Sequence, residues 1–212
     1  MQAHELVIHF ETETRLPIDV NDVLTVMRAA GHDDQIEFIG ADLDPDILQG
    51  AIKIWHQRAI YGDPVRMVNI YYHRGHSKDW QRLITCKESI HIMDPHWVCS
   101  TDVEAIGHLA DSIGLPPVLQ DPFKEDRRTL QDHVAELYAA AILLPWAARE
   151  VMMPLYLDGK LTIDDIARQA DIPRKFASRV MLPGWERIYD HLTHRSELAQ
   201  GEDADEESEG SA

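Results

Sequence analysis

The sequence predicts an α+β fold that is mostly helical, with one small β-sheet. Three observations lead to this prediction. VRMVNIYYH at 65–73 is rich in β-branched and aromatic residues, which is typical of a strand. TLQDHVAELYAAAILLP at 129–145 has apolar residues at helical spacing and many alanines, which is typical of a packed helix. The 212 residues, 44% of them apolar, are enough for one main hydrophobic core.

The first part of the chain predicts alternating strands and helices. In order, these are a strand at 6–13, a helix at 17–31, a strand at 35–43, a helix at 44–63 and a strand at 65–73. The first strand depends on the alternation in LVIHFETE. The first helix has apolar residues three and four positions apart and Gly31 as its stop. The second helix is opened by Asp44 and Pro45 and ends near Gly62.

After the turn GHSKDWQ, the sequence predicts helices throughout. In order, these are a helix at 82–93, a helix at 100–114, a Pro-bearing loop at 115–126, a helix at 129–145, two short helices at 161–181 and a last helix at 184–199. Pro145 closes the long helix, because proline cannot continue it. We expect a main domain at 1–155 and a C-terminal helical segment at 156–199 packed on it. An acidic tail that does not contribute to the core is expected at 200–212.

Charge and composition exclude several classes of protein. The formal net charge is −17, and it is still −11 once the six acids of the tail GEDADEESEG are left out. An acidic body argues against a broad phosphate-binding surface. No apolar run approaches the roughly 18–20 residues that cross a bilayer, and the N-terminus does not resemble a signal peptide. Two cysteines are too few for a disulfide scaffold. Together with the lack of a long apolar run, this leads us to expect a cytoplasmic location and no membrane contact.

The stretch CKESIHIMD at 86–94 differs at one position from the zinc-peptidase signature H-E-x-x-H. In that signature two histidines, four apart on a helix, bind one zinc ion, and the glutamate between them acts on the metal-bound water. Glu88 and His91 occupy the glutamate and second histidine positions, whereas Lys87 occupies the first. A lysine ammonium repels a cation, so Lys87 is not a zinc ligand near neutral pH. Alone, the pattern E-x-x-H is more typical of an ordinary helix that exposes Glu88 and His91 to solvent than of a metal site.

Two further blocks accompany this stretch in a fixed order, DHVAELYAAAILLP and LTIDDIARQADIPRKFASRVML. Together the three blocks resemble the ImmA/IrrE family of metallopeptidase-like proteins over residues 65–182. In that family an Arg-led helix carries H-E-x-x-H, and a second helix has the pattern E-x-x-A-N-x-F-A before Leu-Leu-Met-Pro. Asp132 stands here at the family's third metal ligand, a glutamate, and Glu136 at the asparagine. The matching positions of the second helix are Asp132, Ala135, Glu136, Tyr138, Ala139, Leu143, Leu144 and Pro145.

The resemblance implies a zincin-like domain and a regulatory protein that cleaves or binds a protein regulator, in a phage-related or stress-response setting. It implies Glu88 as the general base of a zinc metallo-endopeptidase if activity is retained, with His91, Asp132 and Glu136 as metal ligands. Because Lys87 replaces a ligand, we expect an altered, non-catalytic site with zinc absent or weakly held. The Lys87 ammonium is then expected within about 4 Å of the Asp132 or Glu136 carboxylate, in place of the metal charge.

The segment at 161–182 supports an alternative, a DNA-binding transcriptional regulator or adaptor. It fits a helix-turn-helix, with Asp171 at the turn position where glycine is common. The residues expected to point outward toward DNA from the second helix are Arg174, Lys175, Ser178 and Arg179. The same pattern is also typical of a C-terminal helical segment whose basic residues face solvent.

Overall fold

The computed structural model describes residues 1–42, 50–58, 63–93 and 127–194, and within 127–132 it describes the helix without its side chains. In these residues the fold is α+β and mostly helical, with a small three-stranded sheet. The strands are β1 (Gln35–Ala41), β2 (Gly50–Gln57) and β3 (Val65–His73). The helices are α1 (Ala3–Phe10), α2 (Val20–Ala29), α3 (Lys78–Ile90), the 3₁₀ turn η1 (His91–Met93), α5 (Arg127–Leu143), α6 (Trp146–Leu157), α7 (Ile163–Ala170), α8 (Arg174–Val180) and α9 (Trp185–Leu192).

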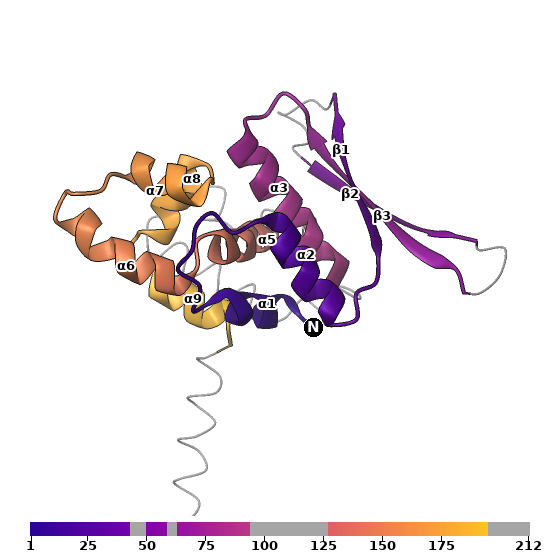
Figure 1. Ribbon diagram of the computed structural model, residues 1–212, viewed down its shortest axis with the longest axis horizontal. Coiled ribbons are helices and arrows are strands. Elements are labelled where there is room, and N and C mark those ends of the chain that lie inside the picture. The colour runs from indigo at the N-terminus through magenta and orange to yellow at the C-terminus, as the bar shows by residue number, and fades with distance from the viewer. Residues whose placement is uncertain (43–49, 59–62, 94–126, 195–212) are drawn as a thin grey trace, which may run out of the picture.

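The sheet has the strand order β1-β3-β2, in which β1 is parallel to β3 and β2 is antiparallel to it. Val68 and Ile70 of β3 are fully buried, whereas the residues between and beside them are partly exposed. Because side chains alternate across a strand, this pattern means that one face of the sheet packs against the core. β2 is an edge strand whose distal residues are exposed, and it extends with β3 away from the helices (Figure 1).

Helix α3 lies at the centre of the molecule (Figure 1). It contacts β2 and β3 on one side and α5 on another, and α5 in turn contacts α1 and α8. The sheet lies to one side of α3, and α6 to α9 gather beyond α5 on the other (Figure 1). All eight residues from Leu83 to Ile90 are buried, so the last two turns of α3 are enclosed on every side. This places the near-signature of the sequence inside the protein.

The strand predicted at 6–13 is wrong, because these residues belong to helix α1. An alternating strand would bury Ile8 with Leu6, but Ile8 is 43% exposed. The buried residues are instead Leu6, Val7 and Phe10, which are spaced as on one face of a helix. The helix begins with a capping box between Gln2 and Glu5, which satisfies backbone amides of its first turn.

The helix predicted at 44–63 is wrong over residues 50–57, which form strand β2. The rest of that range, apart from residues 58 and 63, lies outside the described residues. In GAIKIWHQ the β-branched residues Ile52 and Ile54 are two positions apart, and they pair with Ile70 and Val68 of β3. This segment therefore forms a strand, and not a helix, because it pairs with β3, one face of which already packs against the core.

Helix α6 was not predicted, and α3 begins at Lys78, inside the predicted turn GHSKDWQ. The remaining described elements confirm their predictions within a few residues at each end. Asp19 caps α2 by accepting a hydrogen bond from the Asn21 amide, and Gly31 follows the helix with φ of +94°. Pro145 comes after the end of α5, as expected. The predictions for 100–114, for the loop at 115–126, for the end of the last helix at 195–199 and for the tail lie outside the described residues. No helix in the described part of the chain is long and apolar enough to cross a bilayer.

Candidate functional site

The structure buries both charged residues of the near-signature. Lys87 and Glu88 of α3 have side chains that are 7% and 4% exposed, and the Lys87 Nζ lies 3.1 Å from the Glu88 Oε1. Burying charged groups costs free energy that attraction between opposite charges can offset only when the charges are close. The reading of this stretch as a helix that exposes Glu88 is therefore wrong. The pair brings together the expected general base and the cation that replaces the first histidine.

His91 is half-buried and forms the C-cap of α3, where the chain passes into η1. Its backbone, with φ −64° and ψ −16°, is still right-handed helical. The spacing between positions 87 and 91 therefore remains close to one helical turn, as the zinc-peptidase signature requires. The Asp132 side chain lies outside the described residues, so its predicted approach to Lys87 stays a prediction.

Glu136 lies on α5, and its ion pair is with Arg179 of α8, at 3.9 Å between Oε2 and Nη1. The Lys87 ammonium is within 4 Å of the Glu88 carboxylate, whereas Glu136 pairs with Arg179 of α8. The expected substitute cation is thus buried, as the hypothesis requires. Glu136 is therefore not the carboxylate that pairs with the Lys87 ammonium, contrary to that alternative of the prediction. Within the described residues, no group of three or more His, Cys, Asp or Glu side chains could hold a metal ion.

Gly50, at the start of β2, is a residue of this site that the sequence reasoning missed. A Cβ on Gly50 would lie 2.4 Å from Ile84 Cγ2 and 3.0 Å from Glu88 Oε1. The strand can pass this closely over α3 only because residue 50 has no side chain. The alternation in GAIKIWHQ was the signal for a strand here, but the contact with Glu88 depends on how the strand packs on α3.

The C-terminal segment has the predicted helix–turn–helix arrangement. Asp171 ends α7 in the left-handed conformation, with φ of 51°, and Arg82 of α3 forms a salt bridge to it at 3.2 Å. Of the four residues expected to point outward, Arg174 and Lys175 are exposed and Ser178 is half-buried. Arg179 is only 6% exposed, so the expectation that it points outward is wrong. α8 buries this side because it packs against α5.

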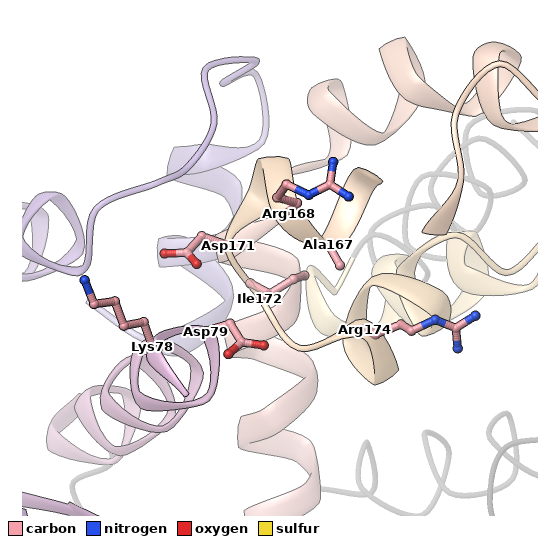
Figure 2. Close-up of a pocket in the computed structure, with 7 residues that line it drawn as sticks. All are labelled: Lys78, Asp79, Ala167, Arg168, Asp171, Ile172 and Arg174. Atoms are coloured by element: carbon pink, nitrogen blue, oxygen red, sulfur yellow. The ribbon is translucent and has the colours of Figure 1, made fainter. Parts of the chain in front are cut away.

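A cavity of about 310 Å³ lies between the start of α3 and the turn joining α7 to α8. Its lining residues are Lys78, Asp79, Ala167, Arg168, Asp171, Ile172 and Arg174. Figure 2 shows that the three basic side chains point away from one another, so they do not converge on one anion. Arg168 and Arg174 also form salt bridges, to Asp165 and Asp164 respectively. The arrangement does not define a ligand by its chemistry.

Cys86, which precedes Lys87, is fully buried, and burial raises the pKa of its thiol to about 12. A thiol that stays protonated at neutral pH is a poor nucleophile and a poor metal ligand. Cys86 is therefore a core residue, and the chemistry of this helix depends on its charged neighbours.

Comparisons of the chain with protein-family models, with curated proteins and with solved structures gave no match.

Proposed function

We propose that this chain is a regulatory protein of metallopeptidase type whose metal site has been replaced by a buried ion pair, and that it binds a protein regulator without cleaving it. The observation that carries the proposal is the contact between Lys87 and Glu88. In a zinc peptidase the glutamate must be available to take a proton from the metal-bound water. In this chain the Glu88 carboxylate is paired with a buried ammonium that takes the place of the metal ion, so it has no metal-bound water to deprotonate.

The edge of the sheet supports a binding role. β2 pairs with β3 on one side, and no described strand pairs with its other side. A sheet edge offers unpaired backbone amides and carbonyls to an extended segment of a partner. The first residue of β2, Gly50, lies against Glu88. A peptide strand added along β2 would therefore pass close to the former catalytic centre. A phage-related or stress-response setting follows from the family resemblance.

Zinc binding and proteolysis in solution test this proposal. The wild-type protein, purified without a His-tag, is expected to bind no zinc in calorimetric titrations and to cleave no peptide from a diverse library in the presence of zinc. Lys87→His restores a histidine pair four residues apart and is expected to bind one zinc ion per chain. Stoichiometric zinc in the wild type, with cleavage that Glu88→Gln abolishes, would overturn the proposal.

DNA binding is the second candidate, supported by the left-handed Asp171 turn and by exposed Arg174 and Lys175 on α8. Gel shifts on mixed-sequence duplex DNA at decreasing salt test it, because phosphate contacts strengthen steeply as salt falls. Binding that weakens in Arg174→Ala and Lys175→Ala supports this candidate. A chain that binds no DNA even at low salt removes it.

A further inference from the structure

The contact between α5 and α8 contains a buried ion pair of unusual geometry. The side chains of Glu136 and Arg179 are 14% and 7% exposed, and their closest charged atoms are 3.9 Å apart. The Oε2 of Glu136 and the Nη1 of Arg179 are both buried, and neither makes a hydrogen bond. The two groups attract each other by charge alone, without the short hydrogen bonds of a fully formed pair.

Arg179 depends on Glu136 because a guanidinium keeps its charge when it is buried. Burial lowers the pKa of Arg179, and the Glu136 carboxylate opposes this effect. Lys175, one turn earlier on α8, is exposed as a whole residue, yet desolvation beside the packed helices lowers its pKa, and the Glu136 carboxylate opposes this effect. The Arg179 guanidinium also lies over the Phe176 ring, 5.5 Å from its centroid. The Glu136 carboxylate of α5 thus pairs with one cation of α8, Arg179, and also attracts the charge of a second, Lys175.

We infer that Glu136 is the counter-ion that fastens α8 to the site helix α5, and that it is not a ligand of any metal held by α3. Drawing the Glu136 carboxylate to a metal would leave the Arg179 charge buried without its partner, and a buried charge that loses its partner is strongly destabilising. The statement that Glu136 does not bind a metal rests on the proposed function. The statement that it is the counter-ion of Arg179 does not. The ion pair therefore links the C-terminal segment to the helix that carries Asp132.

Hydrogen exchange of the backbone amides at 163–180 tests the link. Glu136→Gln and Arg179→Met are each expected to increase exchange in α7 and α8 by about tenfold or more, since each leaves a buried charge or polar group uncompensated. The double variant is expected to exchange less than the product of the two effects, because it removes both charges together. Arg179→Lys keeps the charge and should have a smaller effect than Arg179→Met.

Arg174→Met is the matched control, because it breaks a salt bridge of the same segment, to Asp164. That pair is shorter, at 2.8 Å, but its side chains are 69% and 63% exposed. Exposed pairs contribute little, so exchange should stay at the wild-type level. Unchanged exchange in Glu136→Gln, or effects of the two single variants that simply multiply, would overturn the inference.

A zinc titration separates this inference from the proposed function. In the Lys87→His background, Glu136→Gln is expected to leave zinc affinity within about twofold, since Glu136 faces α8. A loss of zinc binding in that double variant would show that Glu136 is a metal ligand. It would refute the inference that Glu136 serves only as the counter-ion of α8. If Lys87→His itself takes up no zinc, the proposed function fails, and the exchange experiment still decides the ion pair.

Discussion

Removal of the Lys87 ammonium is the perturbation that most directly probes the buried pair. Lys87→Met keeps an unbranched apolar side chain of similar length, so it removes the charge with little loss of packing. The Glu88 carboxylate, 4% exposed, would then be left in the interior without its counter-ion. Breaking a buried pair in this way costs about 3–5 kcal/mol. In a chain of 212 residues, this corresponds to a decrease in Tm of roughly 6–20 °C.

Urea unfolding followed by circular dichroism measures this loss as a lower midpoint at unchanged m-value. Lys87→Met/Glu88→Gln is the decisive control, because it removes both charges and leaves a neutral amide. It is expected to recover more than half of the stability that Lys87→Met loses. A loss below about 1 kcal/mol in Lys87→Met, the scale of an exposed pair, would refute the burial argument. A double variant as unstable as the sum of the single variants would show that the two charges do not interact.

Three further predictions test other parts of the structure. Gly50→Ala is expected to lower stability by about 1–3 kcal/mol in urea unfolding, because its methyl group would overlap α3. Val7→Asp should prevent stable folding, whereas Ile8→Asp should be tolerated within about 0.5 kcal/mol, and the reverse result would restore the strand reading of this segment. The pKa of His76 is lowered from 6.5, first by burial, so the unfolded chain binds more protons than the folded one near and below pH 6.5. Stability from this group is thus complete above about pH 6.5 and lost as the pH falls through the lower folded pKa. His76→Gln should make the urea midpoint depend less on pH. A difference in midpoint between wild type and variant that stays constant from about pH 7.5 to 5.5 would contradict this prediction.

The regular elements could be predicted where one local signal dominated. Strand β3 and helices α2, α5, α7 and α8 have clear patterns, and two of the helices also have a recognisable stop, Gly31 after α2 and Pro145 after α5. The two errors arose where a short segment fits both periods. LVIHF alternates, yet its buried residues Leu6, Val7 and Phe10 lie on a helical face once the chain packs against α5. GAIKIWHQ became a strand because β3 offered it a partner.

The candidate site could be predicted only in part, because its geometry depends on contacts between distant segments. The near-signature located Lys87, Glu88 and His91 from spacing alone. Spacing could not show that Lys87 and Glu88 are both buried and paired, since neighbouring positions on a helix point about 100° apart. The close approach of Gly50 depends on the register of β2 and on its packing against α3. Likewise, Arg179 is basic and lies on a short helix, and only the packing of α8 on α5 shows that it is buried.

The position of zinc in a crystal of Lys87→His tests the central claim most directly. If the Lys87 ammonium occupies the place of a metal ion, a histidine at position 87 should restore metal binding. Crystals grown with zinc, measured at the zinc absorption edge, are expected to show one anomalous peak within about 2.0–2.1 Å of a ring nitrogen of His91 and of the substituted residue. A folded Lys87→His protein with no peak between these residues, or with zinc bound only elsewhere, would contradict it.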